Sequence, residues 1–244
     1  MKDEVAARLV HLTREFYQSF ADEFADSRPK PQPGVKRALR SIARDAPVLD
    51  LGCGHGQTAA ELSRVGHRGR YVGIDSQPRL VELARQIPLP QAEFRLAELT
   101  GPGWAGGLEG AFDSVLLFAL LHHIPGDQLR LQLLREARAC LSPGGRVRLS
   151  VWNVFDSPRL MARRVSWAEG GLAEGDVDPG DLLLDWRRGG RGLRYVHGFT
   201  GEELADLADR CGMRVEDEFR SDGEASAMAT YQTWSASAGE TPPP

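Results

Sequence analysis

The feature that most constrains the fold of this chain is a glycine-rich loop that follows a short apolar run. Residues Val48 to Gly56 read V-L-D-L-G-C-G-H-G. Short apolar runs form buried strands, and glycines after a strand let a ligand approach the backbone closely. The N–H groups of the helix that follows can then bind that ligand. The pattern predicts a nucleotide-type ligand at a strand–helix junction.

Around this loop the chain alternates between short apolar runs and helical patterns. The expected strands are 48–51, 71–74, 93–96, 114–118 and 146–151, and the expected helices between them are 58–65, 78–84 and 127–140. Parallel strands need a long connection, because the chain must return to the same end of the sheet. We therefore expect an α/β fold with a doubly wound, Rossmann-like, mostly parallel sheet.

Segments outside this core are expected to cap it and to complete the sheet. Apolar residues from Val5 to about Asp26 recur at spacings of three and four, which predicts one helix before a proline-rich connector. A helix from Thr200 to Arg210 and an antiparallel pair of C-terminal strands, 213–220 and 228–234, would finish the fold. The expected divisions are an N-terminal helical cap and connector (1–46), the ligand-binding core (47–152), an insertion with partial helix (153–195), the C-terminal completion of the sheet (196–234) and a disordered tail (235–244).

Composition excludes several classes of protein. A formal charge of −4 argues against a chain that coats nucleic acid with basic surface. No apolar run approaches the roughly 20 residues of a membrane span, and no secretory signal is readable at the N-terminus. Cys53, Cys140 and Cys211 match no zinc-binding spacing. We expect a cytoplasmic protein with reduced thiols, no metal and no membrane partner.

The spacing of the glycines argues against a dinucleotide ligand. The dinucleotide fingerprint requires a third glycine three residues after the second, and Gln57 occupies that position. Asp50 precedes the loop, where its carboxylate would repel a pyrophosphate but could accept hydrogen bonds from a cationic amino group. A cofactor with an amino-acid end therefore fits better than one with phosphates.

Acidic residues at the ends of the next two strands complete a candidate cofactor site. Asp75 lies nineteen positions after Gly56, where a carboxylate can accept hydrogen bonds from both ribose hydroxyls. Glu98 could accept from an adenine amino group, and Leu99 could supply an apolar wall. The cofactor candidates are Asp50, Gly52, Cys53, Gly54, Gly56, Asp75, Ser76, Glu98, Leu99 and Phe118.

These residues and three later motifs resemble the class I methyltransferases. The later motifs are F-D-x-V at Phe112 to Val115, H-H-I at His122 to Ile124, and L-S-P-G-G-R at Leu141 to Arg146. The resemblance covers about the middle half of the chain. It implies S-adenosylmethionine (SAM) as the cofactor and methyl transfer as the reaction.

The loop that contains the two histidines is expected to face the reactive end of the cofactor, because it follows the fourth strand. His122 and His123 could orient an acceptor or act as a general base, or they could cap the next helix and fasten the loop. Methyl transfer is a displacement at a sulfonium carbon, so much of the rate can come from holding the nucleophile in line. No base is needed if the acceptor is already an anion.

A closer resemblance lies outside the core, to the tRNA wobble-uridine carboxymethyl methyltransferases. The shared motifs are F-x-D-S-R-P-K-P at Phe24 to Pro31, S-V-W at Ser150 to Trp152, and R-Y-V-H-G-F at Arg194 to Phe199. These enzymes esterify 5-carboxymethyluridine in the anticodon. The resemblance implies that a uridine pocket is bordered by Arg28, Trp152, Arg194, Tyr195 and His197, where the two arginines would suit a carboxylate.

The chain departs from that family at three places. Val196 stands in place of a tyrosine, Gln32 in place of a tryptophan, and Asp222-Gly223-Glu224 in place of a D-N-W motif. The densest basic cluster is Arg187, Arg188, Arg191 and Arg194. It could bind the phosphates of tRNA, or it could belong to a solvated loop.

Two other functions stay open on the sequence alone. A small-molecule O- or N-methyltransferase fits the isoelectric point near 5.9 and the missing tryptophan. A silent SAM-binding subunit that activates another enzyme would also keep the fold, but it need not retain both the glycine loop and its carboxylates. The sequence does not predict the oligomeric state or a protein partner.

Overall fold

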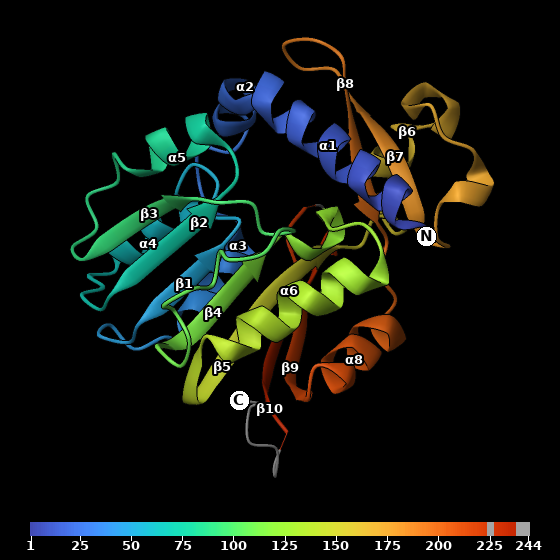
Figure 1. Ribbon diagram of the computed structural model, residues 1–244. Helices are drawn as coiled ribbons and strands as arrows, with labels where there is room; N and C mark the ends of the chain where they lie inside the picture. Colours follow the sequence, from blue (N-terminus) through green and yellow to red (C-terminus); the bar gives the residue numbers. More distant parts are fainter. Residues whose placement is uncertain (224–226, 238–244) are drawn as a thin grey trace.

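A seven-stranded sheet forms the centre of the molecule in the computed structural model, which describes residues 1–223 and 227–237 (Figure 1). Its strand order is β3-β2-β1-β4-β5-β10-β9. The strands are β1 (Val48–Leu51), β2 (Tyr71–Asp75), β3 (Ala92–Leu96), β4 (Phe112–Phe118), β5 (Leu141–Trp152), β9 (Met213–Ser221) and β10 (Ala229–Ala236). Strand β10 pairs antiparallel with both β5 and β9. The predicted doubly wound sheet with an antiparallel C-terminal pair is confirmed.

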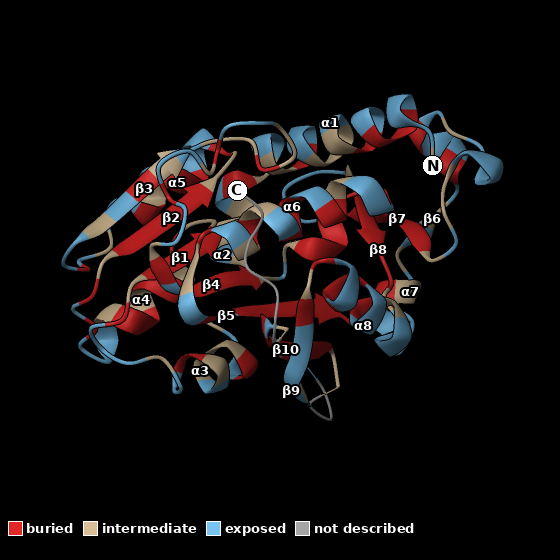
Figure 2. Ribbon diagram, turned by 60° about the horizontal axis from the view of Figure 1, so that its bottom comes forward, coloured by how far each residue is buried: buried red, intermediate tan, exposed pale blue. Residues whose placement is uncertain are grey.

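Helices cover both faces of this sheet. The helices α3 (Pro33–Leu39), α4 (Gln57–Arg64) and α5 (Pro78–Ala84) lie on one face, and α6 (Asp127–Ala139) and α8 (Gly201–Arg210) lie on the other. Successive residues of β1 point to opposite faces, so Val48 packs with the first group and Leu49 with the second. The inner strands are buried while the outer helix surfaces are exposed (Figure 2). Helix α8 begins with the capping box that Thr200 and Glu203 predict.

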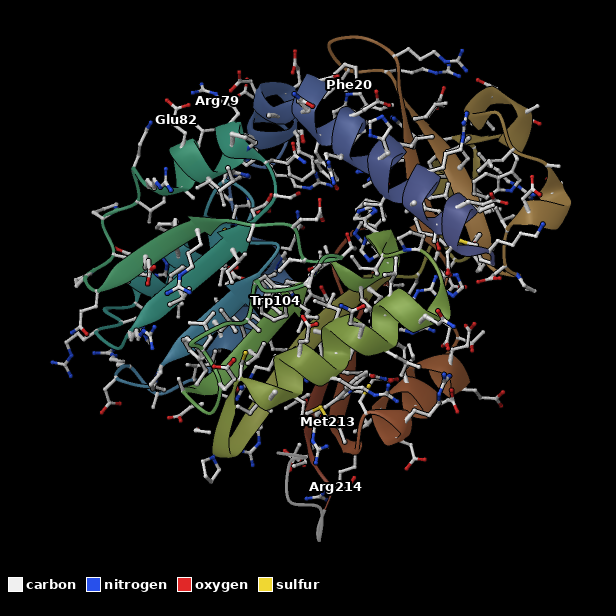
Figure 3. The ribbon with its side chains drawn as sticks, in the orientation of Figure 1. Phe20, Arg79, Glu82, Trp104, Met213 and Arg214 are labelled. Carbon is white, nitrogen blue, oxygen red and sulfur yellow. The ribbon has the colours of Figure 1, made fainter. Side chains whose placement is uncertain are left out.

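The N-terminal segment forms two helices, which corrects the prediction of one. Helix α1 (Asp3–Ser19) ends before Phe20, whose φ of −127° lies outside the helical range, and α2 (Ala21–Asp26) follows. The Phe20 ring lies 5.5 Å from the ring of Phe16 and directly over the backbone of Gly192. This packing overrides the helical periodicity and turns α2 toward α5, whose Arg79 is labelled in Figure 3. Asp22 of α2 pairs with Arg79 at 2.8 Å.

The expected insertion is mainly a second, antiparallel sheet, although only partial helix was predicted for it. Its strands are β6 (Arg164–Val165), β7 (Asp181–Trp186) and β8 (Gly192–His197), preceded by the short helix α7 (Pro158–Met161). One face of this small sheet packs against α1 (Figure 1). The other face packs against Trp152 and Leu160. Strand β8 ends two residues beyond the expected boundary at 195, because Val196 and His197 still pair with the first residues of β7.

The C-terminal strand also extends past its predicted end. Ser235 and Ala236 still belong to β10, although they were expected to start a disordered tail. Residues 238–244 of that tail lie outside the described residues. Within the described ranges, no helix is long and apolar enough to cross a membrane.

Candidate active site

A cavity of about 790 Å³ lies at the carboxyl ends of the central strands, beneath α1, α2 and the small sheet. Nine cofactor candidates line it: Asp50, Gly52, Cys53, Gly54, Asp75, Ser76, Glu98, Leu99 and Phe118. Four acceptor candidates line it as well: Arg28, His123, Trp152 and Arg194. Four candidates are absent from the part of the cavity wall that the described residues form: Gly56, His122, Tyr195 and His197.

The glycines of the loop serve two different purposes. Gly54 has a φ of +54°, and a Cβ atom on it would meet no atom within 4 Å, so this position opens onto the cavity. Gly56 has a φ of +86°, and its Cβ would lie 3.1 Å from the Cα of Ala84. We therefore assign Gly56 to the close packing of α4 on α5, and Gly54 to the approach of a ligand.

Asp50 is a buried carboxyl at the end of β1. It is 2% exposed, and the Tyr71 hydroxyl donates a 2.7 Å hydrogen bond to its Oδ2. Burial raises the pKa of Asp50 to about 7, although hydrogen bonds from Tyr71 and Thr58 oppose the shift. A cationic ligand group would favour the ionised form, which fits the amino group of SAM.

Asp75 is held by the backbone on both of its carboxylate oxygens. The N–H of Gly54 donates to Oδ2 at 2.8 Å, and the N–H of Gln77 donates to Oδ1 at 2.9 Å. Burial raises the pKa of Asp75, and these N–H groups counteract that rise. Each oxygen has two lone pairs, so one on each stays available to a diol in the cavity.

Glu98 already has partners from the chain itself. Arg14 of α1 donates to its Oε2 at 2.9 Å, and the Thr100 hydroxyl donates to its Oε1 at 3.0 Å. Leu99 is buried beside it and lines the cavity. The ion pair joins α1 to the end of the cavity that was predicted to bind adenine.

His123 is a neutral side chain with both ring nitrogens engaged. Its Nδ1 lies 2.9 Å from the backbone oxygen of Tyr195, which can only accept, so Nδ1 carries the proton. Its Nε2 therefore accepts from the Tyr17 hydroxyl at 3.1 Å. Burial, with smaller effects from Arg194 and Arg28, lowers the pKa of His123 to about 3. This histidine is poorly suited to take up a proton.

His122 lies behind the cavity wall. Its ring packs 4.5 Å from the Trp152 ring and 4.3 Å from the His123 ring, and burial lowers its pKa well below the usual range. Neither ring nitrogen has a hydrogen-bond partner among the described residues. The geometry favours a role in supporting Trp152.

Two arginines, the buried Arg194 and the half-buried Arg28, converge on Trp152 inside the cavity. The guanidinium carbon of Arg194 lies 4.7 Å from the Trp152 ring centre, and that of Arg28 lies 6.0 Å from it. Arg194 is 5% exposed. Its Nε and Nη1, and Nη1 of Arg28, have no hydrogen-bond partner among the described residues. Burial lowers the pKa of Arg28 to about 10.

Two neighbouring guanidinium groups of this kind lower the stability of the fold unless an anionic group binds to them. An isolated buried charge is strongly destabilising, and cationic side chains in protein interiors are normally paired with an acid. The two guanidinium groups also carry like charge. The arrangement is therefore suited to bind an anionic group.

Tyr195 and His197 belong to a buried polar network instead of the cavity wall. The Tyr195 hydroxyl donates to Asp181 Oδ1 at 2.6 Å, and His197 Nδ1 lies 2.7 Å from the same oxygen. Arg130 of α6 donates to the Tyr195 hydroxyl at 2.8 Å. Successive side chains of a strand point to opposite faces, so Arg194 of β8 faces the cavity and Tyr195 faces α1. Only the backbone oxygen of Tyr195 reaches the site, through His123.

Local ion pairs divide the arginine cluster that was expected to bind the phosphates of tRNA. Arg187 pairs with the buried carboxylate of Asp185 at 2.6 Å, and Arg191 pairs with Glu169. Both lie near the hairpin loop between β7 and β8, but Arg191 faces an outer groove beside α1. Arg188 lines the main cavity.

Several cavity residues were not predicted. Arg14, Tyr17 and Phe24 come from the first two helices. The apolar stripe of those helices was recognised, but no sequence signal showed that its flank would lie over the cofactor loop. Asp222 was noted only as a departure from a motif, and it fixes the connector by accepting from the N–H of Gly34 at 2.8 Å.

Comparisons with known proteins agree with this geometry. A family described as "Methyltransferase domain" matches residues 17–218. A tRNA (carboxymethyluridine(34)-5-O)-methyltransferase from Schizosaccharomyces pombe is 28% identical over 152 residues, which are 62% of this chain and 60% of that protein. A ubiquinone biosynthesis O-methyltransferase from Xanthomonas campestris is 33% identical over 172 residues, which are 63% of this chain and 68% of that protein. The solved structure of a DhpI-SAM-HEP complex has a TM-score of 0.67 at 22% identity and covers 93% of this chain and 97% of that one.

A doubly wound sheet with a glycine loop and acidic strand ends at its carboxyl edge defines the class I methyltransferases. The chain belongs to the methyltransferase-domain family. It is a SAM-dependent methyltransferase, and the open position at Gly54 and the free lone pairs of Asp75 fit that cofactor.

Proposed function

We propose that this methyltransferase esterifies a carboxylate, and that its acceptor is 5-carboxymethyluridine at the wobble position of tRNA. The observation that carries the proposal is the pair of Arg28 and Arg194 in the cavity, the first half-buried and the second buried, both without an acidic partner among the described residues. A carboxylate matches the planar fork of a guanidinium group, and its negative charge would offset one of the two positive charges while its two oxygens could bond both groups. Trp152, near which both guanidinium groups lie, would form an aromatic wall beside a uracil ring.

Each of the cofactor residues would bind a different part of SAM. Asp50 would hold the amino group, Asp75 the ribose hydroxyls, and Leu99 with Glu98 the adenine. SAM, when bound, supplies a methyl group activated by its sulfonium charge. Gly54 would keep the loop open to the cofactor, because any side chain there would project into the cavity.

On the acceptor side the chain would bind and orient an anion that already is the nucleophile. Arg28 and Arg194 would fix the carboxylate, and positioning of this kind accounts for much of the rate in displacement reactions. Proton removal is unnecessary, which agrees with the neutral, fully engaged His123. Tyr17 would keep that imidazole in place.

The tRNA part of the proposal is supported by the relative from Schizosaccharomyces pombe, whose name states this activity. The chain spans 60% of the length of that relative. The motif residues Arg28, Trp152 and Arg194 meet in one cavity although they lie far apart in the sequence. This convergence is what a shared acceptor would require.

A second candidate is a small-molecule O-methyltransferase, which the Xanthomonas campestris relative favours. A hydroxyl acceptor normally needs a base within hydrogen-bond reach. His123 has no free nitrogen to offer, and His122 lies behind the wall. The geometry therefore supports the carboxylate better.

The test is mass spectrometry of nucleosides from tRNA of cells with and without this protein. We expect 5-carboxymethyluridine to accumulate and its methyl ester to disappear when the protein is absent. Restoring the wild-type chain should restore the ester, and restoring a chain with Asp75→Ala should not. Identical wobble nucleosides in both cells would exclude the tRNA acceptor.

A further inference from the structure

The acceptor half of the cavity contains more arginines than one carboxylate needs. Besides Arg28 and Arg194, its wall includes Arg159, Arg163, Arg187 and Arg188. The acidic residues of the wall are Asp50, Asp75, Glu98 and Asp222. The first three lie at the cofactor end, and Asp222 is already bonded to the N–H of Gly34 and the Tyr231 hydroxyl.

Three of these arginines form a group that we call the mouth arginines: Arg159, Arg163 and Arg188. Arg159 and Arg188 are exposed and Arg163 is partly exposed, although all three line the cavity, so they lie where it opens to solvent. None of the three has a carboxylate partner among the described residues, whereas Arg187 beside them is paired with Asp185. Among the residues that the structure describes, the Arg159 side chain has one hydrogen-bond acceptor, the sulfur of Met228 at 3.9 Å.

The backbone brings the mouth arginines together from two segments. Arg159 and Arg163 are four residues apart across the end of α7, and such residues share one side of a helical turn. The backbone oxygen of Arg163 accepts from the N–H of Asp185 at 2.8 Å, so this turn lies directly beside the end of β7. Arg188 follows two residues after that strand.

We propose that the mouth arginines form a phosphate subsite, separate from the deeper site for the carboxylate. The inference rests on the proposed function, because it assumes that the acceptor carboxylate occupies the Arg28–Arg194 site. The acceptor would then be a nucleotide whose carboxylate enters the cavity while an adjoining phosphate stays at its mouth. A nucleoside would fill the carboxylate site and leave the mouth arginines without a ligand.

The same observations separate this subsite from the rest of the arginine-rich loop. Arg191 is only a few residues from Arg188, but it pairs with Glu169 and faces the outer groove. It supplies a matched control, because it carries the same charge on the same loop without facing the cavity.

The experiment compares two acceptors, 5-carboxymethyluridine and its 3′,5′-bisphosphate, in steady-state methylation. For the wild type we expect kcat/KM to be about ten- to a hundredfold higher for the bisphosphate, the range for hydrogen bonds to a charged group. The double variant R163Q/R188Q should bring this ratio close to one, and R191Q should leave it as in the wild type. Equal ratios in the wild type and in R163Q/R188Q would overturn the subsite.

A binding measurement keeps the two proposals distinguishable. Calorimetry with S-adenosylhomocysteine present should show tighter binding of uridine 3′,5′-bisphosphate than of uridine, and R163Q/R188Q should abolish the difference while R191Q keeps it. If neither carboxylate is methylated but this difference holds, the proposed acceptor is wrong and the phosphate subsite stands. If the carboxylates are methylated and the difference is missing, the subsite is wrong and the proposed function stands.

Discussion

Arg194 is buried against aromatic rings and has two guanidinium nitrogens without a partner among the described residues. A side chain of this kind is retained for binding at the expense of stability. His122, which the sequence made equally prominent, packs behind Trp152. These two residues therefore separate the carboxylate mechanism from one that depends on a base.

Replacing Arg194 by methionine, R194M, keeps the length of the side chain but removes its charge. We expect single-turnover methylation to fall at least about a hundredfold, because the carboxylate loses a bidentate partner. The free energy of unfolding should stay unchanged or rise by about 1 kcal/mol, because a desolvated charge is removed. A urea titration gives the second value.

The matched variant is His122→Gln, which removes the candidate base and keeps a polar side chain. It should lose far less rate than R194M in the same single-turnover assay. The reverse ranking would indicate a hydroxyl or amine acceptor and would contradict the proposed mechanism.

We expect Asp50 to make cofactor binding dependent on pH. Burial raises its pKa from the ordinary value of 3.8 to about 7, so the cofactor-free protein binds a proton that the unfolded chain has released, and its stability falls as pH rises from about 4 to about 7 and then levels off. The cationic amino group of a ligand prefers the ionised form. The affinity for S-adenosylhomocysteine should therefore rise between about pH 6 and pH 8. The rise should be up to about tenfold for each pH unit below the pKa of Asp50, and it should level off above that pKa.

Two variants check this dependence by calorimetry. Asp50→Asn should flatten the profile, because no proton is released on binding. Tyr71→Phe removes a hydrogen bond that lowers the pKa of Asp50, so the midpoint of the profile should move to higher pH. A wild-type affinity that is constant over this range would remove Asp50 from the amino-group site.

At the scale of elements, the parts of the fold that could be predicted are those formed by residues close together in the sequence. The glycine loop and the carboxylates at the ends of β1 and β2 lie in consecutive strand–helix units, so local pattern was sufficient. The small sheet was missed because β7 is buried on both faces and shows no alternation. The break at Phe20 was missed because its cause is a contact with Gly192, far away in the sequence.

The connector that carries Arg28 makes a close contact with β10 at Gly34, in addition to the hydrogen bond from the Gly34 N–H to Asp222. A Cβ on Gly34 would lie 2.2 Å from the Tyr231 ring, so the helix α3 can dock only with glycine there. We expect Gly34→Ala to lower the free energy of unfolding by about 2 kcal/mol through overpacking. It should also raise KM for the acceptor, because Arg28 moves with the connector.

Gly201→Ala is the control for that substitution. A Cβ on Gly201 would meet no atom within 4 Å, so this variant should be as stable as the wild type in thermal unfolding. Equal melting temperatures for Gly34→Ala and the wild type would show that the connector is not fixed in the way described.

At the scale of the whole molecule, the cavity joins two chemistries that lie far apart in the sequence. Acidic residues of the central sheet face the cofactor end, and arginines from the connector, α7 and the small sheet face the acceptor end. A net charge of −4 gave no sign of this separation, because the sum hides how the charges are distributed. Only the three-dimensional arrangement shows which arginines lack an acidic partner.

The central claim is that the acceptor group is a carboxylate. The most direct measurement follows the labelled methyl group of SAM onto two acceptors that differ at one position, 5-carboxymethyluridine and its amide, 5-carbamoylmethyluridine, each within the same anticodon stem-loop. We expect label only in the carboxylate, and its release as methanol in mild alkali, as an ester requires. Label in the amide acceptor, or a product stable to alkali, would contradict the claim.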